Sequence, residues 1–416
     1  MNIAVIGSGI SGLTCAWLLQ RAHRVTVFEK DHRIGGHTAT KLIEHDGKSL
    51  AIDTGFIVYN DWTYPNFIRL LDALGVESQP TDMSFSVSCE RTGLEYGGSN
   101  LDTLFAQRRN LLNFNYLKML RDIVRFNREA LVDLESGALP DSITLGEYLA
   151  RKRFGTLLSS HYLIPMGSAI WSSTLQEMHD FPLLFFVRFF KNHGLLSIND
   201  RPQWRVIKGG SASYLEKLRA DFNGTIRTDA SIQKVTRTAF CATLHFSDGH
   251  TEQFDQVVFA CHSDEALALL GDSTSNERKV LSAIPYRKNH VVLHTDASIL
   301  PRARKAWSAW NYHLDTDTTQ PATLSYNMNI LQSLRSDTTF VVTLNATEKL
   351  DRSKIIGEYE YSHPVFTLDG MNAQQRWAGI NGVNRTWFCG AYWRNGFHED
   401  GCWSGVRVAE ALGAHW

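Results

Sequence analysis

The stretch that decides the fold lies at the start of the chain and reads Ile3-Ala4-Val5-Ile6-Gly7-Ser8-Gly9-Ile10-Ser11-Gly12. The apolar run over residues 3–6 is typical of a parallel strand buried on both faces. The glycines fit the pattern G-x-G-x-x-G, and the few helix breakers in residues 13–20 predict a helix directly after them. Residues 24–29 then predict a second strand that ends in the acid Glu29. This order predicts a Rossmann-type dinucleotide-binding unit.

Each glycine of the turn is expected to have its own physical role. Gly7 permits the tight turn, Gly9 lets the backbone approach a pyrophosphate, and Gly12 lets helix and strand pack closely. The first helical turn offers unpaired N–H groups and the positive end of the helix dipole to phosphate oxygens. Glu29 is expected to accept hydrogen bonds from the adenosine ribose and to repel a 2′-phosphate, which argues against NADP. The residues expected at the dinucleotide are Gly7, Ser8, Gly9, Ile10, Ser11, Gly12, Glu29 and Lys30.

Composition limits the other classes of protein. A chain of 416 residues allows two or three domains, and 42 basic against 43 acidic residues give a net charge of -1. This balance excludes a disordered chain and disfavours a nucleic-acid binder. The six cysteines are scattered without zinc-like spacing, so we expect reduced thiols and no metal site. Since neither a signal peptide nor a run of about 18 apolar residues occurs, we expect a cytoplasmic protein.

Further glycines extend the first motif. Gly35, Gly36, His37 and Thr38 follow Glu29, and Asp53-Thr54-Gly55 comes later. With these residues the chain resembles the flavin-containing amine oxidase and phytoene desaturase superfamily. Residues 289–296, 306–312, 363–366 and 396–401 narrow the resemblance to a bacterial amine-oxidase-like subfamily of predicted NAD/FAD-binding proteins. The resemblance implies FAD as the cofactor, and a simple loop is the alternative for the glycine pair. It places these residues at the FAD: Gly35, Gly36, His37, Thr38, Thr54 and Gly55.

Two later stretches strengthen the resemblance. Residues 204–220 read as a strand, a glycine pair and a helix, and the backbone near Val235 stands where family members contact the adenine. Residues 387–412 read as a strand, a turn at Gly390 and a helix that begins near Phe397, His398 and Glu399. In the family this helix points its N-terminus at the flavin ring. Its dipole would stabilise a reduced flavin by about 0.3–1 kcal/mol.

The resemblance implies an α/β fold with a Rossmann-type FAD-binding domain and a discontinuous α+β substrate domain. We expect the FAD-binding domain to comprise residues 1–78, 201–271 and 371–416, and the substrate domain residues 79–200 and 272–370.

The catalytic candidates follow from their predicted place beside the flavin. Phe397 holds a position where the family often has an aromatic ring, and Tyr392 either lines the same face or packs beneath the C-terminal helix. His398 and Glu399 either anchor the flavin or transfer protons. Lys288 is a candidate for the lysine that reaches flavin N5 through water in family members. The spacing of His290 and His294 favours buried or edge histidines over a metal site.

Two segments of the substrate region bear on the partner. Residues 104–134 predict a basic amphipathic helix, which would contact an anionic membrane surface or simply face solvent. Residues 182–191 are almost wholly apolar and would enter lipid, wall an apolar tunnel or form a core helix. The sequence therefore predicts an FAD-dependent oxidoreductase acting on a small molecule or lipid, such as a fatty acyl chain. An amine oxidase and a flavin-holding partner protein without turnover are the alternatives, and the oligomeric state is open.

Overall fold

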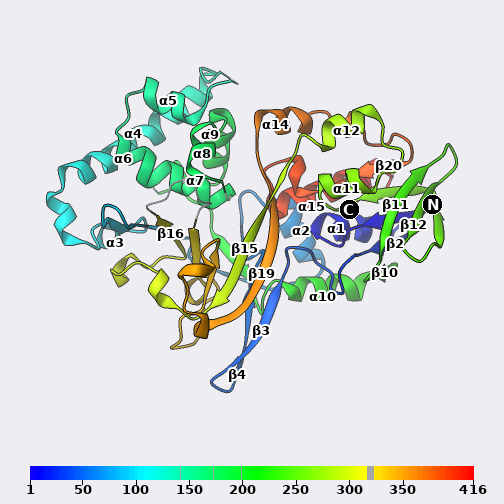
Figure 1. Ribbon diagram of the computed structural model, residues 1–416, viewed down its shortest axis with the longest axis horizontal. Coiled ribbons are helices and arrows are strands. Elements are labelled where there is room, and N and C mark those ends of the chain that lie inside the picture. The colour runs from blue at the N-terminus through cyan, green and yellow to red at the C-terminus, as the bar shows by residue number, and fades with distance from the viewer. Residues whose placement is uncertain (141, 172, 198, 316–322) are drawn as a thin grey trace. The chain divides into compact units, whose positions relative to one another are not determined.

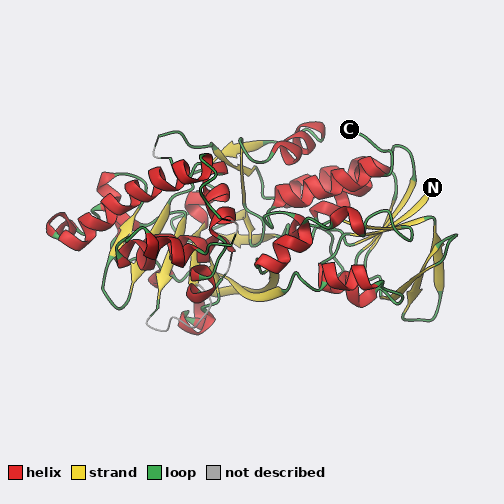
Figure 2. Ribbon diagram, turned by 90° about the horizontal axis from the view of Figure 1, so that it is seen from above, coloured by secondary structure: helices red, strands yellow, loops and turns green. Residues whose placement is uncertain are grey.

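The computed structural model describes residues 1–140, 142–171, 173–197, 199–315 and 323–416. The chain forms two compact units. The first comprises residues 1–79, 207–287 and 364–416 and contains both termini (Figure 2). The second comprises residues 80–206 and 288–363. The first unit extends past the expected limit at 271 because α12 (Ser275–Leu281) buries Val280 and Leu281 in its core.

A parallel sheet forms the centre of the first unit (Figure 1). The strand order is β10-β2-β1-β14-β20, and every paired neighbour is parallel. The side chains of Ile3, Ala4 and Val5 on the central strand are fully buried, as expected for a strand covered on both faces. The predicted α/β fold is confirmed. The strands are β1 (Asn2–Ile6), β2 (Arg24–Phe28), β10 (Thr225–Arg227), β14 (Gln256–Phe259) and β20 (Thr386–Phe388).

An antiparallel sheet and several helices complete the first unit. The Phe28 ring lies 5.8 Å from the rings of both Phe246 and Phe254, so this second sheet packs against the parallel one. Its strands are β11 (Ile232–Arg237), β12 (Ala242–Phe246) and β13 (Thr251–Phe254), and β3 (Thr40–His45) pairs with β4 (Lys48–Asp53) as a hairpin. The other helices are α1 (Ile10–Leu19), α2 (Pro65–Ala73), α10 (Ala212–Asp221), α11 (Ser263–Leu269), α14 (Leu368–Gln374) and α15 (His398–Ala411).

A mixed sheet forms the centre of the second unit. Its order is β19-β15-β18-β17-β16-β7-β8, with β16 and β7 parallel and the pairs β15–β18, β17–β18, β16–β17 and β7–β8 antiparallel. The strands are β7 (Phe85–Cys89), β8 (Glu95–Gly97), β15 (Tyr286–His294), β16 (Trp310–Leu314), β17 (Thr323–Asn327), β18 (Val341–Leu344) and β19 (Ile355–Pro364). Its helices include α3 (Leu101–Leu104), α4 (Phe114–Glu135), α5 (Leu145–Arg151), α7 (Ile164–Trp171), α8 (Leu175–His179) and α9 (Leu183–Asn192).

One helix of this unit begins later than predicted, and another takes one of its predicted alternatives. The helix predicted from residue 104 begins at Phe114, because the Asn113 side chain caps it by accepting a hydrogen bond from Tyr116 N at 3.2 Å. A 3₁₀ turn, η1 (Arg108–Leu112), precedes it. α9 is a core helix, since its Phe186 and Phe190 side chains are fully buried and stack with ring centroids 4.0 Å apart. Within the described ranges no helix is both long enough and apolar enough to cross a membrane.

Candidate functional site

The turn between β1 and α1 has two glycines that packing requires and one that packing does not. Gly7 has φ +108°, and a Cβ there would lie 2.9 Å from the Ala260 backbone. A Cβ on Gly12 would lie 2.0 Å from the Gly7 carbonyl oxygen. Around Gly9, by contrast, a Cβ would meet no described atom within 4 Å. The first turn of α1 thus faces open space at Gly9, as a pyrophosphate would need.

Glu29 closes one side of this turn. Its Oε2 accepts hydrogen bonds from Ser8 N at 3.0 Å and Ser8 Oγ at 2.5 Å, and its Oε1 accepts one from Asp31 N at 3.0 Å. A carboxylate has about four acceptor sites. The buried Glu29 therefore orders the glycine turn and retains acceptor capacity for a ribose hydroxyl.

The second glycine pair packs against the first turn. Gly35 N donates to the Ser8 carbonyl oxygen at 3.0 Å, and a Cβ on Gly36 would lie 3.2 Å from Gly9 Cα. Both glycines have positive φ, at +108° and +56°. The Arg33 guanidinium fixes the segment by donating to the Gly36 and Thr38 carbonyl oxygens. The glycine pair therefore packs against the first glycine turn and is not a simple surface loop. We call these two segments, residues 7–12 and 35–38, the cradle.

The turn at residues 53–55 is fixed against this segment. A Cβ on Gly55 would lie 2.1 Å from the His37 carbonyl oxygen, which also accepts a hydrogen bond from Phe56 N at 2.8 Å. Thr54 Oγ1 donates to the Ala39 carbonyl oxygen at 3.1 Å. The polar backbone of His37 and Thr54 thus serves to join two stretches of chain beside the glycine turns.

Helix α15 lies beside α1 (Figure 1). A Cβ on Gly401 would lie 2.7 Å from Ile10 Cγ2, and one on Gly405 would lie 2.3 Å from the Ser11 carbonyl oxygen. The first turns of both helices consequently lie together, just beyond the carboxyl ends of β1 and β20. Two positive helix ends at one place favour an anionic ligand.

His398, at the start of α15, stands in an aromatic cage. Its ring stacks on Phe56 with centroids 3.7 Å apart and planes at 8°, and the Phe67 ring meets it edge-on at 4.9 Å. His398 Nε2 lies 2.9 Å from the Tyr214 hydroxyl, which lies 2.7 Å from Thr38 Oγ1. Burial lowers the pKa of His398 to about 3. The imidazole is therefore neutral near pH 7, which suits a positioning residue better than a proton donor.

The two carboxylates after His398 are committed to the protein. Glu399 accepts hydrogen bonds from Asn66 Nδ2 at 2.6 Å and from Phe67 N at 2.9 Å, so it caps the N-terminus of α2. Asp400 Oδ2 accepts from Phe397 N at 2.9 Å and caps α15 itself. Burial raises the pKa of both groups, that of Asp400 to about 7. Glu399 thus caps α2 because the fold brings that helix start to it, and its place at the flavin stays a prediction.

Of the aromatic candidates, Tyr392 lies deep in the core. It is 2% exposed, Trp393 is 4% exposed, and their ring centroids are 5.1 Å apart. This burial favours packing beneath α15 over a place at the substrate. Phe397 is half-buried at the N-cap of α15, and Gly390 N donates to Ser404 Oγ at 3.1 Å.

Three of the predicted residues, Lys288, Lys30 and Val235, have partners other than His398 and its neighbouring rings. Lys288 belongs to the second unit, where its ammonium pairs with Glu360 at 2.8 Å and 73% of the side chain is exposed. This is an exposed ion pair and not the dry setting that a lysine aimed at a flavin requires. Lys30 pairs with Glu265 at 2.5 Å. Val235 is fully buried in β11, and its carbonyl accepts from Gly271 N at 2.9 Å.

Several site residues were not predicted from the sequence. Tyr214, Phe56 and Asn66 contact His398 or Glu399, and Ser211 donates hydrogen bonds from N and Oγ to Asp53 of the expected Asp53-Thr54-Gly55 turn. The only local signals were the neighbouring motifs, since Phe56 follows Asp53-Thr54-Gly55 and Tyr214 follows Gly209-Gly210-Ser211.

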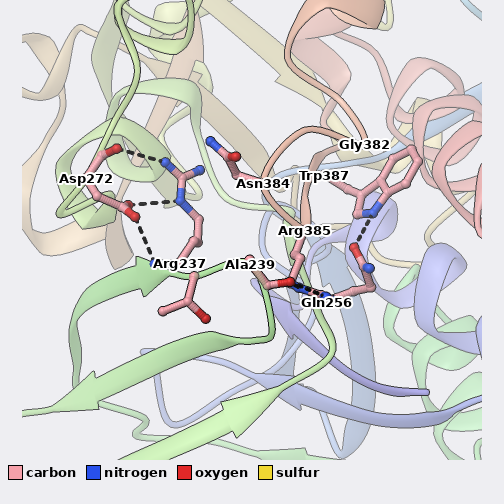
Figure 3. Close-up of a pocket in the computed structure, with 9 residues that line it drawn as sticks. Arg237, Ala239, Gln256, Asp272, Gly382, Asn384, Arg385 and Trp387 are labelled. Carbon is pink, nitrogen blue, oxygen red and sulfur yellow. Dashed lines mark hydrogen bonds and ion pairs between the residues drawn. The ribbon is translucent and has the colours of Figure 1, made fainter.

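A polar groove of about 550 Å³ lies elsewhere on the first unit, at the amino ends of β14 and β20 (Figure 3). Its Arg237 guanidinium binds Asp272 and Glu277, and its Arg385 guanidinium binds the Ala239 carbonyl oxygen. Because the glycine turns follow the carboxyl ends of the strands and these arginines are already paired, the groove is not the dinucleotide site.

Comparison with known proteins decides between the dinucleotides. Residues 10–294 match the model of the family described as flavin containing amine oxidoreductase. The chain belongs to this family. Membership makes FAD the cofactor of the cradle, and the open face at Gly9, the two helix N-termini and Glu29 fit it. The expected resemblance is confirmed.

Individual relatives are distant. An L-amino-acid oxidase of Siganus canaliculatus is 22% identical over 330 residues, which cover 71% of this chain and 57% of that protein. The chain thus spans little more than half the length of this relative. Among solved structures, the CLA-producing fatty acid isomerase of P. acnes has a TM-score of 0.70 at 16% identity, covering 98% of both chains. Wild-type putrescine oxidase bound to putrescine has a TM-score of 0.71 at 16% identity, covering 100% of both chains.

Proposed function

We propose that this chain uses FAD to dehydrogenate an apolar substrate, a fatty acyl chain. Bound FAD supplies the two-electron acceptor, which oxygen or another oxidant regenerates. Two adjacent carbons of the acyl chain would lose one hydrogen each, the FAD would take up both on its two-electron reduction, and the chain would gain a carbon–carbon double bond. The protein's part is to bind the cofactor in the cradle, to orient it with the α15 dipole and to exclude water with the aromatic rings of Phe56 and Phe397.

We infer the substrate class from the hydrogen-bond partners of the polar side chains at the start of α15. An amine is a cation at neutral pH, and a buried cation needs a carboxylate partner. Glu399 accepts hydrogen bonds from the start of α2, and Asp400 accepts one from the Phe397 N–H. His398 is a neutral ring that stacks on Phe56. Asp400 also lies 3.8 Å from the Arg394 guanidinium, so these acids are engaged within the protein and this helix start favours an apolar substrate over an amine.

The similar structures are compatible with this substrate class without deciding it. One of them is a fatty acid isomerase and another is a putrescine oxidase, so the fold serves both substrate chemistries. An amine oxidase is the second candidate, because the L-amino-acid oxidase and the putrescine oxidase both act on amines.

The test is anaerobic reduction of the bound flavin by candidate donors. The FAD-loaded protein is mixed in turn with phospholipids carrying acyl chains, with putrescine and with L-amino acids, and the loss of oxidised-flavin absorbance is followed. Bleaching by lipid, with a product that lacks two hydrogens by mass spectrometry, supports the proposal. Bleaching by amines alone refutes the acyl substrate and leaves an amine oxidase. If no donor reduces the flavin and the protein instead binds another protein tightly, the flavin-holding alternative replaces both.

A further inference from the structure

An exposed apolar tip projects from the second unit where η1 passes into α4 (Figure 1). We define the apolar tip as Leu111, Leu112 and Phe114, whose exposed fractions are 51%, 93% and 80%. Leu101, on the neighbouring helix α3, is 73% exposed. Large apolar side chains gathered at one exposed place mark an interaction site more often than scattered ones do.

Buried neighbours hold the tip in a defined conformation. Tyr116, fully buried one turn into α4, donates from its hydroxyl to the Leu104 carbonyl oxygen at 2.7 Å and so joins α4 to α3. Gln107 Nε2 donates to the Gly93 carbonyl oxygen at 2.8 Å and joins the start of η1 to the β7–β8 turn. Because hydrogen bonds fix the chain on both sides of the apolar tip, the tip has a defined backbone conformation that keeps its side chains out of the core.

Basic residues flank the apolar tip along the chain. Residues 105–121 contain four basic side chains and no acidic one: Arg108, Arg109, Lys118 and Arg121. Asp102, the acid that precedes this stretch, is shared by Arg108 and by Lys305 of a neighbouring segment, so one carboxylate offsets two bases. Arg121 is 74% exposed and lies 3.7 Å from the buried Asp122. Since the whole chain has a net charge of -1, this basic stretch is a local feature.

We propose that the apolar tip inserts into an anionic phospholipid bilayer and that the flanking bases bind the lipid phosphates. An apolar cluster with flanking bases matches the membrane interface, where acyl chains begin a few ångströms below a layer of phosphates. A protein partner would also bury apolar side chains, but a bilayer explains the apolar tip and the flanking bases together. The inference rests on the second unit alone and holds whichever substrate the flavin oxidises.

The experiment measures binding of the FAD-loaded protein to vesicles by co-sedimentation. Mixed phosphatidylglycerol and phosphatidylcholine vesicles are compared with phosphatidylcholine vesicles. The wild type is expected to bind the anionic vesicles more tightly and to lose affinity as salt rises. The double substitution Leu112→Ser and Phe114→Ser should weaken binding by about tenfold or more, because both side chains lose most of their apolar area. Arg121→Glu should weaken it by about fivefold or more.

Phe240→Ser is the matched control, because Phe240 is 83% exposed but lies in the first unit. It should bind as the wild type does, and circular dichroism should show that every variant is folded. Three outcomes overturn the proposal: no binding of the wild type to anionic vesicles, equal binding by the doubly substituted tip, or a concentration-dependent dimer that the tip substitutions abolish. The last outcome would assign the apolar tip to a second copy of the chain.

Discussion

Replacement of Gly9 by alanine should separate cofactor binding from folding. Gly9 has φ -65° and ψ 176°, an extended conformation that alanine adopts without strain, and a Cβ there meets no described atom within 4 Å. We therefore expect the free energy of unfolding of the FAD-free protein to change by less than about 1 kcal/mol. The methyl group would instead occupy the space of the pyrophosphate. Loss of one hydrogen bond to a charged phosphate is worth about 1.5–3 kcal/mol, or about a tenfold to hundredfold weaker FAD affinity.

Gly12→Ala is the contrasting variant on the same turn. Its Cβ would lie 2.0 Å from the Gly7 carbonyl oxygen, so helix and turn must separate by about 1 Å, and overpacking of this kind costs about 1–3 kcal/mol or more. The assay pairs thermal unfolding of the FAD-free proteins with titration by FAD, followed through quenching of flavin fluorescence. The reasoning fails if Gly9→Ala binds FAD as tightly as the wild type, or if it unfolds as readily as Gly12→Ala.

Four further substitutions, one of them made in combination, test the charges. Burial raises the pKa of Asp400 from 3.8 to about 7, so the folded state holds an extra proton in this window. The free energy of unfolding should therefore fall as pH rises from about 4 to about 7, by at most about 1.4 kcal/mol per pH unit. Asp400→Asn should flatten that slope in denaturant unfolding, and an unchanged slope would assign it to other groups. Lys288→Met removes an exposed pair and should change stability by less than about 1 kcal/mol and leave flavin reduction unchanged; slower flavin reduction would restore its predicted role. Arg237→Met leaves the carboxylate of Glu277, 1% exposed, without its guanidinium and should cost about 3–5 kcal/mol in urea unfolding. Glu277→Gln in the same chain should recover part of that loss, and no recovery would refute the pairing.

The sequence by itself determined the dinucleotide-binding half of the fold. The strand, the turn from Gly7 to Gly12, the helix and Glu29 are consecutive in the chain, so each requirement of the site is met within a short window. The C-terminal helix begins at His398, where the sequence predicts a helix start near Phe397. The order of the parallel strands joins segments far apart in the chain and was decided by the tertiary structure. The first residue of α4 was not predicted from the hydrophobic pattern. The Asn113 side chain caps the helix, so α4 begins later than the apolar periodicity indicates.

Tertiary structure alone decided what the side chains at the site do. Thr38, Phe56, Tyr214 and His398 are far apart in the sequence, and only the folded chain brings their rings and hydroxyls together. A short stretch of sequence does not show whether a side chain is buried, and it is burial that lowers the pKa of His398 and keeps its ring neutral. Burial also does not follow hydrophobicity alone, because packing against long-range neighbours buries Tyr392 with its hydroxyl in the core and leaves the aliphatic Leu112 in solvent.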